Sequence, residues 1–326
     1  MSYIVTWGAG FIGSVFVWYL NQQGIKDIII VDHLDATEKW KNLVGKKYKN
    51  YFDKYEFFHK MKEGWYISKK DIVIHLWACS ATTEADAQYL MENNTKYSRI
   101  LYEQCNLVWA RFIYASSAAT YGNGSQWYSD DNYNLQPLNM YGYTKQLFDQ
   151  RILDWTKNFK VYKSQVVGLK FFNVYGPNEY HKGSMASVIY HGFNQIQKEK
   201  KIWLFKSYKK WFKDGEQKRD FIYVKDVVKI IDFFIKNPKQ NWIFNVWTGE
   251  ARTFNDLAQA IFKALTMKSN IFYKEMPDTL KEKYQYFTQA EMTKIKKAGY
   301  KEKLHSLEEW VKDYVQNYLD KECCIF

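Results

Sequence analysis

The sequence predicts a doubly wound parallel α/β sheet in its first half and a smaller α/β domain in its second half. Short apolar runs alternate with segments of helical periodicity, and a glycine-spaced turn joins the first run to the first helical segment. The chain has 326 residues, of which 47% are hydrophobic, so it can bury a large core. Strands that alternate with helices are joined by right-handed crossovers, which is typical of a Rossmann-like parallel sheet.

The expected elements follow the chain in order. Apolar runs in the first half predict strands, and the helical patterns between them predict helices. The strands are expected over residues 4–6, 27–32, 71–76, 111–117 and 165–172, and the helices over 11–23, 86–105, 141–159 and, in the second half, 254–265. After Pro177 the alternation weakens. We therefore expect a Rossmann-like domain over 1–172 and a substrate-binding domain over 173–326, with residues 221–250 returning to the first.

Charge and cysteine content argue against several classes of partner. The net charge is +12, but only five of the 47 basic residues are arginine and they are scattered, which disfavours a nucleic-acid partner. The four cysteines lack the spacing of a metal site or a disulfide scaffold. No leader opens the chain, and no apolar run approaches the ~18 residues that a membrane span needs. We therefore expect a cytoplasmic protein with no metal, membrane or nucleic-acid partner.

The turn after the first strand has the glycine spacing of a dinucleotide-binding site. Gly8, Gly10 and Gly13 stand between a predicted strand and a predicted helix. Backbone N–H groups and the helix N-terminus can meet a pyrophosphate there. Asp32 ends the second strand, and an acidic residue about 20 positions after such a turn binds an adenosine ribose. A strand-end cap is the alternative interpretation of Asp32.

A serine, a tyrosine and a lysine form the candidate catalytic group. Ser117 ends the strand RFIYASS, and Tyr141 and Lys145 follow on the next predicted helix. Residues four apart share one face of a helix, so the Lys145 ammonium can lower the pKa of the Tyr141 phenol and also hold a cofactor ribose. These residues predict a proton shuttle beside a bound dinucleotide.

This combination of glycine turn, serine and Tyr-x-x-x-Lys resembles the extended short-chain dehydrogenase/reductase superfamily. Within it, longer stretches are similar to the ADP-L-glycero-D-manno-heptose 6-epimerase family. They are ACSATTE (78–84), YASSAATYG (114–122), FFNVYGPNEYHKGSMASV (171–188), DGEQKRDFIYVKDVV (214–228) and YQYFTQAEMTKIKKAGY (284–300). The resemblance runs from the first strand nearly to the C-terminus, and HKGSMAS is its most specific element.

The resemblance implies a tightly bound nicotinamide cofactor that takes hydride from C6 of an ADP-heptose and returns it to the other face of a 6-keto intermediate. Two acid/base groups are then needed, and Tyr141 and Lys182 match them. Lys145 would orient the cofactor, and Ser117 would hydrogen-bond the reacting oxygen. By composition alone, Lys182 would be a solvated loop lysine. The product would serve surface-glycan or lipopolysaccharide-core synthesis, and the family suggests a homo-oligomer, a pentamer.

Further positions are implied only by matches to the family's binding residues. For the substrate they are Ser117, Asn173, Ser184, His191, Phe205, Lys206, Ser207, Tyr208, Arg219 and Tyr284. For the cofactor they are Phe11, Ile12, His33, Lys39, Lys54, Leu76, Ala78, Cys79, Ser80, Asn93, Lys145, Val174 and Lys182. Lys39 and Lys54 would favour the 2′-phosphate of NADP, whereas Asp32 favours NAD, so NADP is expected and NAD stays open.

Three other functions remain open. A 4-epimerase of the same superfamily would need only one tyrosine base, so Lys182 disfavours it. A 4,6-dehydratase should carry an Asp-Glu pair where this chain has Ser117-Ala-Ala-Thr120. A non-catalytic cofactor-binding relative could dispense with Tyr141, which this chain keeps.

Tryptophan stands at several places where glycine is expected. Trp7 occupies the first glycine slot of the turn, and an indole neither adopts φ > 0 readily nor lets a phosphate approach the backbone. Typical usage of ~7% would give about 23 glycines, and the chain has 16. The suspect positions are Trp7, Trp77, Trp109, Trp127, Trp211, Trp242, Trp247 and Trp310. We hypothesise that they are glycine in the cell, encoded by UGA; divergence to an impaired enzyme is the alternative.

Overall fold

The computed structural model describes residues 1–63, 67–79, 81–82, 84–159, 164–281, 284–321 and 325–326. The strands are β1 (Tyr3–Thr6), β2 (Ile28–Asp32), β3 (Asn50–Asp53), β4 (Ile72–His75), β5 (Arg111–Ser117), β6 (Val166–Phe171), β7 (Asn173–Tyr175), β8 (Ile202–Phe205), β9 (Lys218–Tyr223), β10 (Trp242–Val246), β11 (Ala251–Thr253) and β12 (Ile271–Lys274). The α-helices are α1 (Phe11–Gln22), α2 (Lys54–Lys62), α3 (Ala87–Leu90), α4 (Tyr97–Val108), α5 (Met140–Phe159), α6 (Val188–Glu199), α7 (Val224–Lys236), α8 (Phe254–Ala264), α9 (Asp278–Lys281), α10 (Thr293–Lys297) and α11 (Leu307–Tyr314). Short 3₁₀ segments are η1 (Glu38–Leu43), η3 (Ala118–Tyr121) and η4 (Tyr180–Met185), and π segments are η2 (Met91–Lys96) and η5 (Val315–Leu319).

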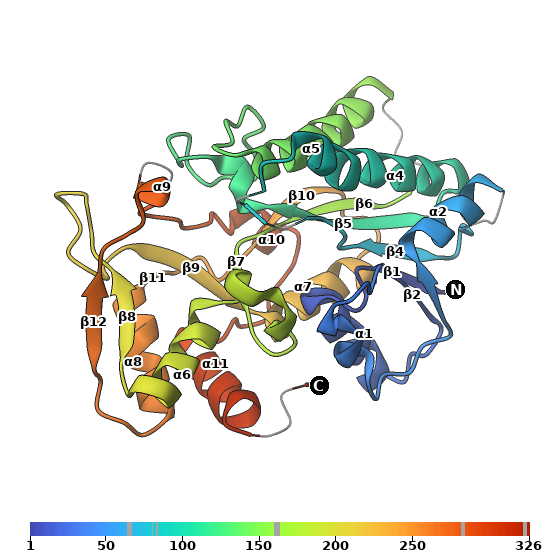
Figure 1. The fold of residues 1–326 in the computed structure, drawn as a ribbon. Coiled ribbons are helices and arrows are strands. Elements are labelled where there is room, and N and C mark those ends of the chain that lie inside the picture. Colours follow the sequence, from blue (N-terminus) through green and yellow to red (C-terminus); the bar gives the residue numbers. More distant parts are fainter. Residues whose placement is uncertain (64–66, 80, 83, 160–163, 282–283, 322–324) are drawn as a thin grey trace.

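Seven strands form one parallel sheet in the order β10-β6-β5-β4-β1-β2-β3, which confirms the predicted fold class. The order reverses between β1 and β4, so the carboxyl ends of these strands open a crevice. Helices α4 and α5 cover one face of the sheet, and α1 and α7 cover the other (Figure 1). The predicted strands agree with β1, β2, β4, β5 and β6 to within one residue at each end.

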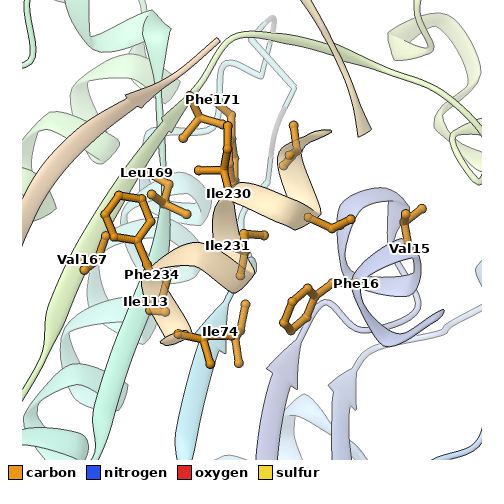
Figure 2. Close-up of a cluster of buried hydrophobic side chains, with 14 of the residues drawn as sticks. Val15, Phe16, Ile74, Ile113, Val167, Leu169, Phe171, Ile230, Ile231 and Phe234 are labelled. Atoms are coloured by element: carbon orange, nitrogen blue, oxygen red, sulfur yellow. The ribbon is translucent and has the colours of Figure 1, made fainter. Parts of the chain in front are cut away.

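Each face of the sheet has its own apolar core. On one face, Phe16 of α1 and Ile230 and Phe234 of α7 belong to one core cluster with Ile113 of β5 and Leu169 of β6 (Figure 2). The core of the other face joins α2, α4 and α5 to the same strands. Because both faces are covered, the strands read as continuous apolar runs instead of alternating ones.

The second half contributes to the large sheet as well as forming its own layers. Strand β10 pairs in parallel with β6 at the sheet edge, and α7 packs on α1. The remaining strands form a three-stranded sheet, β11-β9-β7, and a two-stranded sheet, β12-β8. Helices α6, α8 and α11 share a separate apolar core with them. The division of the chain at residue 172 stays a prediction. Over the described residues, no helix is both long and apolar enough to cross a membrane.

Candidate active site

A cavity of about 830 Å³ lies at the carboxyl ends of the central strands. Its lining comes from the turn after β1, the end of β5, the start of α5, η4 and the second half of the chain. Fifteen of the predicted site residues line it: Phe11, Ile12, Gly13, Lys39, Leu76, Ala78, Cys79, Ser117, Tyr141, Lys145, Asn173, Val174, Lys182, Arg219 and Tyr284. Residues far apart in the sequence therefore face one open cavity.

Ser117, Tyr141 and Lys145 come together where β5 ends and α5 begins. All three are buried, and a hydrogen bond with Ser117 opposes the effect of burial on Tyr141. Burial raises the pKa of Tyr141, so the lowering expected from Lys145 is wrong for this structure. The Lys145 Nζ donates to the Ala115 carbonyl at 2.8 Å, and burial lowers its pKa to about 8. Lys145 can therefore lose its proton near neutral pH.

Lys182 reaches the same cavity from η4. Its Nζ lies 5.3 Å from the centre of the Phe11 ring, and its backbone N–H donates to the Glu179 carbonyl at 3.0 Å. Burial lowers the pKa of the Lys182 ammonium, and the Glu179 carboxylate partly opposes this. Burial therefore favours the neutral amine of Lys182 more than solvent would favour it in an exposed loop lysine.

Glu179 stabilises the loop that carries Lys182, because it bonds residues on both sides of that lysine. Its buried carboxylate accepts from the Ser187 N–H at 2.7 Å, the Ser187 hydroxyl at 2.6 Å, the Tyr314 hydroxyl at 3.0 Å and the Gly176 N–H at 3.3 Å. It thus joins both ends of the loop to α11. Our sequence reasoning missed this residue, although it lies only three positions before Lys182.

Replacing Glu179 by alanine is expected to lower the free energy of unfolding by ~2–4 kcal/mol, because four buried donors lose their acceptor together. Denaturant unfolding measures the change. Glu302→Ala removes an exposed carboxylate and serves as the control. If both variants lose the same small amount, the loop is held by other contacts.

The cofactor half of the cavity carries a second buried charge pair. Asp32 accepts from the Ala9 N–H at 2.8 Å, the His33 N–H at 2.7 Å and the Lys39 Nζ at 2.8 Å. The Lys39 Nζ also lies 4.1 Å from the centre of the Trp7 ring. The Lys39 ammonium therefore balances the charge of the Asp32 carboxylate.

The glycines of the turn allow close packing at two points. A Cβ on Gly13 would lie 2.0 Å from the Trp7 carbonyl oxygen, so only glycine lets α1 approach the turn. A Cβ on Gly10 would lie 1.5 Å from the Trp7 ring. The indole therefore covers Gly10, where a pyrophosphate would approach in a dinucleotide site.

The substrate half is built around Arg219. This buried guanidinium lies 5.1 Å from the Tyr284 ring and 5.8 Å from the Phe254 ring. Burial raises the pKa of Tyr284, and Arg219 opposes it. A cation between two aromatic rings suits both phosphate and an adenine base.

Twelve predicted residues lie outside the cavity lining: Gly8, Gly10, Asp32, His33, Lys54, Asn93, Ser184, His191, Phe205, Lys206, Ser207 and Tyr208. Asp32 supports a lining residue, because it accepts from the Lys39 Nζ at 2.8 Å. The Lys54 Nζ donates to Asn93 at 3.1 Å, and both of these residues lie outside the lining. Lys206 bonds the exposed Glu275 at 2.7 Å, away from the cavity. Ser80 lies outside the described residues. Over the described part of the chain, no cluster of three metal-ligating side chains occurs.

A buried network that sequence reasoning also missed lies behind the serine. Asp149 accepts from the Tyr114 hydroxyl at 2.9 Å and the Ser116 hydroxyl at 2.7 Å, and it lies 3.0 Å from the Lys170 Nζ. Asp149 is four residues after Lys145 on α5. Tyr141, Lys145 and Asp149 are therefore spaced so that they share one face of the helix. The network fixes α5 against β5 and β6, and so fixes Tyr141 beside Ser117.

Comparison with known proteins gives consistent results. Residues 3–246 match the model of the NAD dependent epimerase/dehydratase family. The chain is 50% identical to an ADP-L-glycero-D-manno-heptose-6-epimerase of Fusobacterium nucleatum, covering 98% of both chains. It is 51% identical to the protein of the same name from Nitratidesulfovibrio vulgaris strain DP4, covering 97% of this chain and 98% of that one. The Helicobacter pylori protein of that name has a similar crystal structure, with TM-score 0.77, 27% identity and coverage of 97% and 95%.

Proposed function

The chain belongs to the NAD dependent epimerase/dehydratase family, and we propose that it interconverts ADP-D-glycero-D-manno-heptose and ADP-L-glycero-D-manno-heptose at C6. One observation carries this function: Tyr141 and Lys182 come from different elements and line the same cavity. Oxidation and reduction at opposite faces of one carbon need a proton-transfer group on each side. Relatives that bear this activity in their names share half of the residues over nearly the whole chain.

The chain's own residues handle the proton at the C6 oxygen. When bound, the nicotinamide cofactor supplies the hydride acceptor and donor. Tyr141 and Lys182 each hold or release the hydroxyl proton of one epimer, and the lowered pKa of Lys182 lets it act as a base. The Ser117 hydroxyl keeps the reacting oxygen in place beside Tyr141. Arg219, Tyr284 and Asn173 bind the ADP end, so that the sugar reaches the catalytic group.

Incubation with ADP-D-glycero-D-manno-heptose, followed by NMR of the C6 epimers, tests the function directly. Formation of the L-glycero epimer supports it. A UDP-hexose is the contrast substrate: C4 epimerisation of that sugar, with no reaction of the ADP-heptose, would instead establish a 4-epimerase.

We propose NADP as the cofactor within this NAD-dependent family. Lys39 neutralises Asp32, the carboxylate that would otherwise accept a ribose hydroxyl of NAD. Lys39 lines the cavity, and Lys54 is a second buried cation that lies outside its lining. The residues at the adenosine and nicotinamide ends fit a dinucleotide, but Trp7 does not fit the pyrophosphate between them.

Replacing Lys39 by alanine is expected to weaken NADP binding about tenfold more than NAD binding, because a charge-assisted contact to the 2′-phosphate is lost and Asp32 is freed to accept a ribose hydroxyl. Fluorescence titration with both reduced cofactors measures this. Lys41→Ala, which removes an exposed neighbour paired with Glu38, is the control. Equal losses for both cofactors would place Lys39 away from the 2′-phosphate.

A cytoplasmic location and a homo-oligomer, a pentamer by family resemblance, remain proposals. Analytical ultracentrifugation of the 39.1 kDa chain separates a monomer from a pentamer.

A further inference from the structure

Four tryptophans have a backbone conformation that favours glycine. Among the described residues, eight non-glycine residues have positive φ, and four of them are Trp7 (57°), Trp109 (64°), Trp127 (63°) and Trp242 (92°). Asn and Asp, which tolerate this region, account for two of the others. A bulky residue there is a strained exception, so four tryptophans in one chain need an explanation.

Trp109 illustrates the fit to glycine most directly. It follows α4 with φ 64° and ψ 28°, and the next N–H, of Ala110, bonds the Cys105 carbonyl at 2.9 Å. A helix that ends in this way usually carries glycine at the left-handed position. The indole of Trp109 is 43% exposed, so its burial in a core does not explain its presence.

Two further tryptophans are buried with an unpartnered indole N–H, and one of them also overlaps a neighbouring ring. The Trp247 ring centre lies 2.6 Å from that of Phe172, whereas aromatic pairs normally keep ~4.5–7 Å. Trp247 is fully buried and Trp77 is 3% exposed. The indole N–H of each is buried without a hydrogen-bond partner. Both sites suit a residue without a side chain.

Other tryptophans of the described residues behave differently. Trp18, Trp40 and Trp203 have ordinary φ values. Trp18 stacks on Phe326 at 4.2 Å, and Trp203 packs beside Phe272 at 5.2 Å. The strain is therefore confined to the suspect positions and is not a general property of tryptophan in this chain. Nothing in the structure requires glycine at the exposed Trp211 or at Trp310, whose indole N–H bonds Asp226 at 2.5 Å.

We propose that the functional protein carries glycine at positions 7, 77, 109, 127, 242 and 247, each encoded by UGA and translated as glycine. At position 7 the consequence is chemical: removing the indole uncovers Gly10 and opens the turn to a pyrophosphate. The proposal does not depend on which sugar the enzyme uses.

The gene and the native protein provide the first test. We expect UGA at these six codons and UGG at those for Trp18, Trp40 and Trp203. Peptide mass spectrometry of the protein from its source cells should find glycine at the six sites. UGG codons, or tryptophan in the peptide that contains position 7 or 247, would overturn the proposal.

Two synthetic chains provide the second test: the printed one and one with the six glycines. The glycine chain is expected to melt more than about 10 °C higher and to retain NADP through gel filtration, which the printed chain should not. A third chain, with Trp18, Trp40 and Trp203 changed to glycine, should melt lower than the printed one. A glycine chain that melts no higher than the printed one would overturn the proposal. Improved stability and cofactor retention without ADP-heptose turnover would support the six glycines and contradict the proposed function instead.

Discussion

Tyr141→Phe and Lys182→Met are each expected to reduce epimerisation by ~10²- to 10⁴-fold, because each removes a proton-transfer group. Both side chains line the cavity. Cofactor retention should be unchanged. Both substitutions are made in the synthetic chain that turns over substrate, either the printed chain or the chain with six glycines.

Reaction of each variant with each single epimer separates the two roles, and isotope labelling tests the hydride transfer. Each variant should retain partial reaction with one epimer only, if each residue serves mainly one face of C6. Deuterium at substrate C6 should remain in the product, because hydride returns to the same carbon. Near-full activity of Lys182→Met would indicate a one-base epimerase, and loss of the label to solvent would indicate deprotonation at carbon.

Asp149→Ala is expected to lower the free energy of unfolding by ~3–5 kcal/mol, because it leaves the Lys170 ammonium buried without its counter-charge. Both side chains are almost fully buried, and two hydroxyls lose their acceptor as well. Denaturant unfolding measures the loss. Asp154→Ala, an exposed change on the same helix, is the control.

The double variant Asp149→Ala/Lys170→Met distinguishes the charge effect from lost packing. If the uncompensated ammonium is the cause, removing it should recover part of the stability. The single variant Lys170→Met completes the comparison. If the double variant loses as much unfolding free energy as the two single variants together, the pair is not coupled.

The sequence predicted most of the sheet because its strands are buried on both faces. Strand β3 and helix α2 were missed, since their segment is rich in lysine and aromatic residues and only Phe52 of β3 is buried. As an edge strand, β3 carries little of the apolar signal that marks a central strand. The glycine turn and the Tyr141–Lys145 pair were predictable because their spacing is local.

The substrate half could not be predicted in the same way. The approach of Arg219 to Tyr284 depends on how β9 and the segment near residue 284 fold together, and no periodicity encodes it. The residues suggested at 205–208 begin at the last residue of β8 and continue past it, outside the cavity lining. Glu179 also bonds Tyr314, and Asp149 bonds Tyr114, and these contacts between distant parts of the chain became visible only in the structure.

The position of β10 affects how the chain can be synthesised. Strand β6 ends at Phe171, but its outer neighbour β10 ends only at Val246. At ~5–20 residues per second, a ribosome needs roughly 4–15 s to make the intervening segment. During that interval the nascent sheet exposes an unpaired edge and the apolar face that α7 will cover, which is a template for aggregation. A chaperone that binds nascent chains would have its main opportunity in this interval.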